Sequence, residues 1–190
     1  MKFLIITLLL FLMQTEHCPD TGDARRVEIQ RLNILKNRHS LPKPEEIDRS
    51  VSSAKLFNSG DRPNAFNEHA AASIEGYILK AKEEKEESCN CHSHNPSNWD
   101  YHVYLTLDKE AHKIGESIVI EITPYTRKLH PEYTLEYMQH LKGKKVRITG
   151  WLMFDFEHLS NSYESHPEVE KVFRHTVWEI HPITSIEVIN

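Results

Sequence analysis

Residues 145–156 read KVRITGWLMFDF, and this stretch decides the fold that we expect for the chain. Apolar residues fall on every second position from Val146 to Phe156, which is the period of a β-strand with one fully apolar face. Gly150 interrupts the run at its middle, and a glycine inside a strand favours a bulge or a sharp bend. We therefore expect a strand that bends and serves two sides of a small barrel.

Four more segments with alternating apolar residues flank this stretch. They are residues 74–79, 101–107, 117–123 and 176–189. One helix is predicted over residues 131–141, because Pro131 suits a first helical turn and Gly143 suits a stop. Three strands, a helix and two strands is the order of a five-stranded OB-like Greek-key barrel. Another small all-β barrel or sandwich is the alternative, because strand pairing is not visible in a sequence.

The chain before the barrel is predicted to consist of a signal region and a lead-in segment. We expect a signal region over residues 1–18, a lead-in over 19–67 and the barrel domain over 68–190. Met1 to Met13 holds one lysine and then an apolar run too short to span a bilayer, which is typical of a signal peptide. Residues 24–38 have the apolar spacing of a short amphipathic helix, which Asp23 can cap, and an irregular lead-in follows.

The signal region predicts an exported protein, either periplasmic, secreted or lipid-anchored. Cys18 can be the lipidated cysteine of a bacterial lipoprotein and would then anchor the chain to a membrane. The three residues before it, Thr15 to His17, fit such a signal poorly. The net charge of −5 argues against a strong electrostatic grip on nucleic acid, so a protein or sugar ligand is preferred.

The ligand-binding face of OB barrels is built from strands two and three and from the loops that follow strands one and four. In this chain the two loops are residues 81–100 and 157–175, and both are rich in histidine. We expect them to meet at one rim. The candidate ligand-binding residues are Asp100, His102, Tyr104, Trp151, Glu179 and His181. Trp151 is predicted to face outward, so it contacts either a ligand or the N-terminal segment.

Four of these residues form two pairs with a spacing that suits metal binding or acid–base chemistry. Asp100 and His102 stand two residues apart on a predicted strand, as do Glu179 and His181, so each pair faces one side. Such a pair can bind a metal ion, or the carboxylate can orient the imidazole. The alternative is a pair of ordinary surface residues, and replacement of either histidine by alanine is expected to leave the fold intact. Trp178 lies on the opposite face of the strand from Glu179 and His181, and it is predicted to lie in the core.

The loop SCNCHSH offers a second candidate metal site. Its possible zinc ligands are Cys89, Cys91, His92 and His94. Thiolates and imidazoles suit zinc, but the spacing matches no zinc-finger pattern. The alternative is a polar loop with free thiols, or with one thiol paired to Cys18.

Six segments of the chain are distinctive: LNILKNR, SCNCHS, DYHVYL, IVIEITP, GWLMFDFEH and WEIHPIT. In these segments the chain resembles a family of exported bacterial OB-fold-like proteins of unknown function. The resemblance implies export and a β-barrel, and it implies no reaction. It adds weight to Asp100, His102, Glu179 and His181 as functional residues.

No nucleophile elbow, phosphate loop or HExxH motif occurs in the sequence, so no catalytic residue is assigned. The first hypothesis is therefore a binding module rather than an enzyme. The second is a metal-assisted hydrolase that uses the cysteine and histidine loop with zinc. The third is a structural or interaction protein of the cell envelope.

Overall fold

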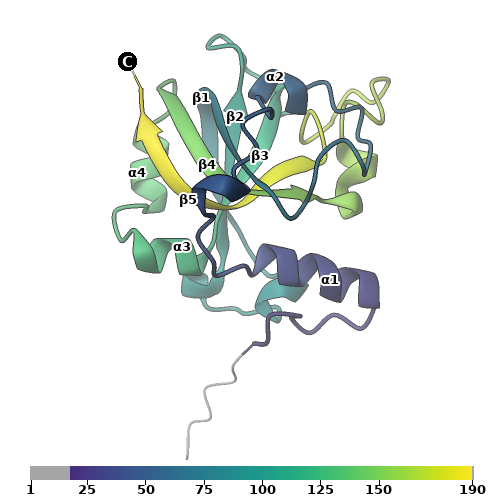
Figure 1. Ribbon diagram of the computed structural model, residues 1–190, viewed down its shortest axis with the longest axis vertical. Coiled ribbons are helices and arrows are strands. Elements are labelled where there is room, and N and C mark those ends of the chain that lie inside the picture. The colour runs from purple at the N-terminus through teal and green to yellow at the C-terminus, as the bar shows by residue number, and fades with distance from the viewer. Residues whose placement is uncertain (1–17, 190) are drawn as a thin grey trace, which may run out of the picture.

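The computed structural model describes residues 18–189 (Figure 1). Its strands are β1 (Ala71–Glu84), β2 (Asp100–Thr106), β3 (Ser117–Ile122), β4 (Lys145–Phe154) and β5 (Trp178–Val188). Its α-helices are α1 (Val27–Lys36), α2 (Ser53–Leu56), α3 (Pro124–Leu129) and α4 (Leu135–His140). Five short 3₁₀ turns lie in the connections, among them η2 (Ser88–Asn90).

The five strands close into one barrel in the order β1-β2-β3-β5-β4, and β4 pairs back with β1. All neighbours are antiparallel except β3 and β5, which meet in parallel at Ile120 and Ile180. The two helices α3 and α4 lie between β3 and β4 along the chain. The expected closed barrel of five strands, with helical structure between the third and fourth, is confirmed.

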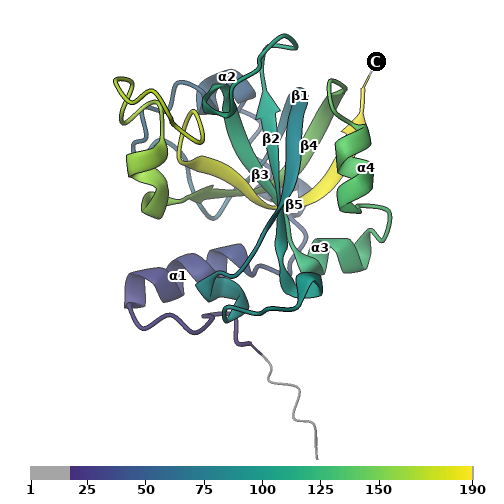
Figure 2. The same ribbon diagram turned by 180° about the vertical axis from the view of Figure 1, so that it is seen from behind.

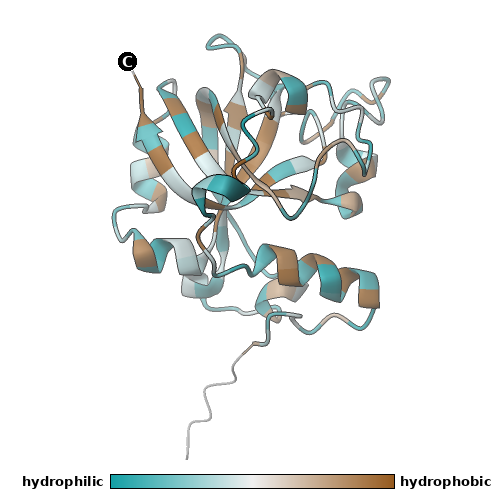
Figure 3. Cartoon of the chain, in the orientation of Figure 1, coloured by the Kyte–Doolittle hydropathy of each residue, from teal (hydrophilic) through white to brown (hydrophobic). Residues whose placement is uncertain are grey.

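Strand alternation builds the core of the barrel. Hydrophobic and hydrophilic residues alternate along the strands (Figure 3), and the hydrophobic ones point inward. Trp178 is fully buried, and its ring packs edge-on against Phe66 and Phe154. Its indole Nε1 donates a hydrogen bond to the carbonyl oxygen of Arg62 at 3.0 Å. The predicted core position of Trp178 is confirmed.

Gly150 of β4 pairs with both neighbouring strands, with Ala72 of β1 and with Ile183 of β5. The register between β4 and β5 shifts on both sides of this glycine. A Cβ atom at this position would lie 2.5 Å from the carbonyl oxygen of Pro182 and 2.6 Å from Cγ2 of Ile180. The close approach of β5 therefore requires glycine, and the predicted irregularity at this position is confirmed.

The helical segment differs from the prediction. In place of one helix over residues 131–141, α3 begins at Pro124 directly after β3 and α4 follows separately. The side chains of Thr123 and Thr134 accept hydrogen bonds from the first turns of the two helices. Pro131 lies in the turn between them. The prediction was wrong because these capping threonines were not recognised as helix starts.

The N-terminal cap, which we define as residues 18–38, packs on the loop that precedes β2 (Figure 2). A disulfide joins Cys18 to Cys91, and the Asn37 side chain donates a hydrogen bond to the carbonyl oxygen of Cys89 at 3.0 Å. One sulfur cannot form both a disulfide and a thioether to lipid, so anchoring through Cys18 does not fit this structure.

Helix α1 confirms the predicted helix, but not its amphipathic character, because Val27 and Ile34 are exposed while Asn33 and Lys36 are buried. Arg26 stands at its N-cap in place of Asp23.

Among the described residues, no helix combines the length and the apolar character needed to cross a membrane. The signal predicted over residues 1–18 lies, apart from Cys18, outside the described part of the chain.

Candidate functional site

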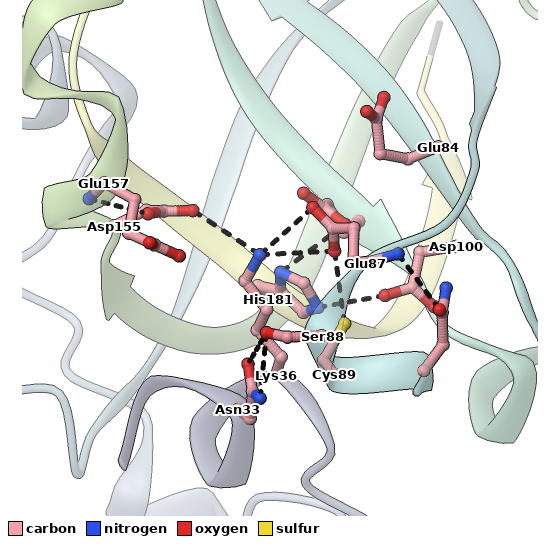
Figure 4. Close-up of polar contacts among 12 residues, drawn as sticks. Asn33, Lys36, Glu84, Glu87, Ser88, Cys89, Asp100, Asp155, Glu157 and His181 are labelled. Carbon is pink, nitrogen blue, oxygen red and sulfur yellow. Dashed lines mark hydrogen bonds and ion pairs between the residues drawn. The ribbon is translucent and has the colours of Figure 1, made fainter. Parts of the chain in front are cut away.

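A group of ionisable side chains lies on the outer face of β2, β3 and β5, beneath the N-terminal cap (Figure 4). We call it the charged cluster, and its members are Lys36, Glu87, Cys89, Asp100, His102, Glu121, Asp155, Arg174, Glu179 and His181. All of them are buried except Glu87, which is half-buried. A group of this size is costly to bury unless each charge is compensated.

Strand pairing assembles the cluster. Because Ile120 and Ile122 face the core, Glu121 between them must face outward. The register of β2 and β3 sets His102 opposite Glu121. Since β3 also pairs with β5 beside Ile180, the outward residues of three strands converge at one place.

His181 stands at the centre of the cluster and is completely buried. Its Nε2 lies 3.5 Å from Oδ2 of Asp100, and its Nδ1 lies 3.5 Å from both Oε2 of Glu121 and Oε2 of Glu179. These separations are too long for good hydrogen bonds. Accordingly, both imidazole nitrogens and the two glutamate oxygens have no hydrogen-bond partner among residues 18–189.

Burial acts to lower the pKa of His181, but the surrounding carboxylates of Glu121, Asp100 and Glu179 outweigh it and raise the pKa to about 10. The ring is therefore an imidazolium that faces three carboxylates when no metal ion is bound.

His102 occupies the other side of Glu121. Its Nε2 lies 2.5 Å from Oε1 of Glu121, while its Nδ1 lies 3.4 Å from Oε2 of Glu84. Burial opposes the charged form of His102, and the Glu121 carboxylate more than offsets this, so the pKa of His102 is raised. Burial likewise opposes the charge of Glu121, yet the two histidines hold the pKa of that carboxyl below its ordinary value.

Two permanent cations complete the cluster. Arg174 forms a buried ion pair with Glu179. Lys36, from α1, reaches in with its Nζ 3.3 Å from Oε2 of Glu87 and 3.7 Å from Oδ2 of Asp155. Burial raises the pKa of Glu87, but Lys36 outweighs this effect and the pKa falls to about 2. Lys36 thus joins the N-terminal cap to the loops on both sides of the cluster.

Three side chains of the cluster could hold a metal ion together. Asp100, Glu121 and His181 each offer one ligand atom, and these atoms all lie within 4.8 Å of one another. Carboxylate oxygen and imidazole nitrogen are ligands that zinc accepts.

The structure brings together four of the six candidate ligand-binding residues, namely Asp100, His102, Glu179 and His181. All four are buried, so the surface position on which the expectation of dispensable histidines depends is wrong. Tyr104 is also buried, and its ring lies edge-on to His102. These are not surface pairs, because the cap and the loop before β2 cover them.

Trp151 does not belong to this site. It is buried on the outside of the barrel, where its Nε1 donates a hydrogen bond to the carbonyl oxygen of Ser40 at 2.8 Å. The guanidinium of Arg38 lies 5.1 Å from the centre of its ring. Of the two contacts expected for Trp151, the structure therefore shows the one with the N-terminal segment.

The predicted metal site in the loop before β2 is wrong as a group of four. Cys91 is bonded to Cys18, and the exposed His92 and His94 pair with Asp23 and Glu86 at 2.9 and 2.7 Å. The backbone of Cys91 and His92 has positive φ, which turns the loop so that alternate side chains do not point together. Of the four, Cys89 alone faces the charged cluster.

The two histidine-rich loops do not share a rim. The backbone N–H of His175 donates to Ser117, at the end of β3 that pairs with Thr106. Cys91 precedes Asp100, at the opposite end of β2. The site therefore lies on the strand face between these two ends.

Sequence reasoning missed five members of the cluster, which are Lys36, Glu87, Glu121, Asp155 and Arg174. Glu121 had a detectable signal, since it is a charged residue between the isoleucines of an otherwise apolar strand. Glu87 ends a run of charged residues that begins at Lys82, and such a run usually faces solvent, but here Lys36 pairs with Glu87.

No protein-family model matches the chain, and no curated protein matches it. Among solved structures, a chain from the crystal structure of yeast Stn1 and Ten1 is similar, with a TM-score of 0.39 and 12% sequence identity. The similarity covers 74% of this chain and 62% of that chain, so this chain spans less than two thirds of its length. At this level the similarity carries no argument about function.

Proposed function

We propose that this chain is an exported OB-type barrel module that binds a divalent transition-metal ion, with zinc as the best fit. Two features support the OB assignment: the closed strand order β1-β2-β3-β5-β4 and the helical segment after β3. The charged cluster lies on β2, β3 and β5, and the strand-two and strand-three surface is where OB barrels commonly bind ligands.

The observation that carries metal binding is the geometry of Asp100, Glu121 and His181. Two ligand atoms bound to one tetrahedral zinc ion lie about 3.4 Å apart, given zinc distances of about 2.0–2.1 Å. His181 approaches the two carboxylates through different nitrogens, Nε2 toward Asp100 and Nδ1 toward Glu121, at 3.5 Å each. Either separation matches this spacing and is poor for a hydrogen bond, and the ion would bind one of the two nitrogens. A metal ion would also give a partner to Oε2 of Glu121 and to one of the two unpartnered nitrogens of His181.

We propose metal binding rather than hydrolysis because the N-terminal cap covers the site. Lys36, the last residue of α1, is itself buried, and its ammonium group lies beside Glu87 at the edge of the site. An ion fits in such a position, whereas a substrate would need the cap to move. The buried acidic cluster also disfavours nucleic acid, and the preference for a protein or sugar partner stays a prediction.

Export is proposed on two features. The first is the apolar segment over residues 1–13, and the second is the disulfide between Cys18 and Cys91, since such bonds persist mainly in oxidising compartments. Membership of the exported bacterial family is also proposed, on the sequence segments alone. We expect mass spectrometry of the protein from its native cells to show a shortened N-terminus and a chain with one alkylatable thiol. A full-length chain that retains Met1 and three free thiols would contradict export.

The metal site predicts a thermal shift. A chelator-treated sample is expected to gain roughly 5–10 °C in melting temperature at a zinc concentration of about 100 Kd, because binding then adds about 2.7 kcal/mol to stability. Glu121→Gln keeps the shape of the side chain but weakens the ligand, so most of this gain should disappear. Differential scanning calorimetry measures both.

Glu136→Gln is the matched control, since Glu136 is exposed on α4 and loses the same charge. It should retain the full zinc effect. If the wild-type chain shows no shift with zinc, cobalt or manganese, the proposed function is wrong.

A further inference from the structure

The N-terminal cap covers the charged cluster, so an ion reaches the metal site only when the cap or a neighbouring loop moves. His181 is completely buried, and Asp100 and Glu121 are 5% and 1% exposed. Ligands buried this deeply are not in contact with bulk solvent, so binding and release of an ion both require a local opening. The segment that opens must be one that can leave the barrel without unfolding its core.

The cap is the segment best suited to open, because its apolar contacts are separate from the core of the barrel. Leu32 and Leu35 of α1 pack with Met153 in a small cluster of their own, whereas the residues inside the barrel form one large cluster. Loss of the small cluster leaves the large one intact. Segments that bury few apolar contacts open at a lower free energy than core strands do.

Polar contacts make up another part of the interface between the cap and the loop before β2. Nδ2 of Asn33 donates to Oγ of Ser88 at 3.1 Å, and Lys36 pairs with Glu87 (Figure 4). The backbone N–H of Asp23 donates to the carbonyl oxygen of Ser88 at 3.1 Å. Water can replace such hydrogen bonds when the cap lifts, so they oppose its opening only weakly.

The disulfide between Cys18 and Cys91 adds a covalent fastening to these contacts. Just after the C-terminal end of the cap, Trp151 bonds the carbonyl oxygen of Ser40 and anchors the chain to the barrel. At the N-terminal end, the disulfide ties the cap to the loop before β2. With both ends fixed, α1 cannot swing away from the cluster, and cutting the disulfide frees one end. Such a link disfavours the open arrangement because it removes chain freedom from it.

We propose that the N-terminal cap is a lid over the metal site and that the disulfide latches it, so that the ion exchanges slowly in the oxidised chain and rapidly in the reduced chain. This inference rests on the proposed function, since it concerns the regulation of the same site. An oxidising compartment forms the bond and thereby retains the ion. A dithiol opens the latch: the S–S bond breaks, Cys18 and Cys91 each gain a hydrogen, and the dithiol loses both hydrogens and becomes a disulfide.

Cys89 can report the opening of the lid without any metal. The chain has three cysteines, all of them in its described part, and with the disulfide intact the buried Cys89 is the one free thiol. It is also the one thiol of the double variant Cys18→Ser, Cys91→Ser, so both metal-free chains carry the same reporter. Modification by a maleimide, followed by mass spectrometry, is expected to be at least about tenfold faster in the double variant.

The same two chains, loaded with Zn²⁺, test the regulation of the site. Transfer of zinc to a colorimetric chelator should also be at least about tenfold faster from the double variant. Trp178→Phe is the control for both measurements, since it weakens the barrel core but leaves the cap and the disulfide unchanged. It should match the wild type in thiol modification and in zinc release.

A second measurement avoids any substitution at the cysteines. The wild-type chain is reduced with dithiothreitol, desalted and treated with the same maleimide, and peptide mapping counts Cys89 separately from Cys18 and Cys91. Modification of Cys89 should be at least about tenfold faster than in the unreduced chain. A double variant that fails to fold therefore does not prevent the decision.

The outcomes separate the two proposals. If both chains bind zinc and release it at the same rate, with Cys89 equally unreactive, the latch is overturned and the metal site stands. If neither chain binds zinc, the proposed function is overturned together with the control of ion exchange, and the reactivity of Cys89 decides whether the cap is a latched lid. If Trp178→Phe speeds the modification as much as loss of the disulfide does, Cys89 is reached by global unfolding and the latch is overturned.

Discussion

Replacement of His181 by alanine is expected to lower the free energy of unfolding of the metal-free chain by about 3–5 kcal/mol. The imidazole is completely buried and is the cation shared by Asp100, Glu121 and Glu179. Without it, these carboxylates face one another in a site that water does not reach, and the cost of an uncompensated buried charge exceeds that of an ordinary lost contact. Chemical denaturation monitored by tryptophan fluorescence measures the change.

The matched control is His94→Ala, because the His94 side chain is 86% exposed and also lies beside a carboxylate. Its loss should change stability by less than about 0.5 kcal/mol. If the two variants are equally stable, the cap does not bury His181, and the metal site loses the geometry on which it depends.

Replacement of Trp178 by alanine is expected to cost about 3–5 kcal/mol, as large truncations in a close-packed core do. The ring is fully buried between Phe66 and Phe154, and its Nε1 bonds the carbonyl oxygen of Arg62. Truncation would leave a cavity inside the barrel and also remove the link to the lead-in segment. The same denaturation experiment gives the value.

Trp178→Phe serves as the control for this prediction. It retains an aromatic ring but loses the hydrogen bond to Arg62, so a smaller cost of about 1–2 kcal/mol is expected. A nearly neutral Trp178→Ala would mean that the alternation of β5 is reversed. Glu179 and His181 would then face the core in its place, and the charged cluster would not form.

Local periodicity was sufficient to predict the strands and the side on which most residues lie. Alternate apolar positions in residues 145–156 predicted β4, and the gap at Gly150 predicted its irregular pairing. The same alternation assigned Asp100, His102, Glu179 and His181 to the opposite face from Trp178. These features follow from a repeat of two residues, which needs no knowledge of distant segments.

The helix after β3 and the loop before β2 could not be predicted in the same way. The first turns of α3 and α4 are each fixed by one hydrogen bond, which the side chain of Thr123 or Thr134 accepts. Other residues nearby, such as Pro131, are equally plausible helix starts in the sequence. Cys91 forms a disulfide with Cys18, which lies 73 residues away in the chain, so the loop sequence alone could not show that Cys91 is unable to bind a metal ion. Spacing within the loop therefore suggested four zinc ligands, although only Cys89 faces the cluster.

The sequence by itself determined the strands of a small barrel and the outward parity of two histidines and two carboxylates, because these properties repeat along a short stretch of chain. Only the tertiary structure decided that those residues form a buried centre. The pairing of β3 with both β2 and β5 placed Glu121 among them, and α1 covered the face and brought Lys36. Burial and charge compensation depend on segments far apart in the sequence, so they arise only when the chain has folded.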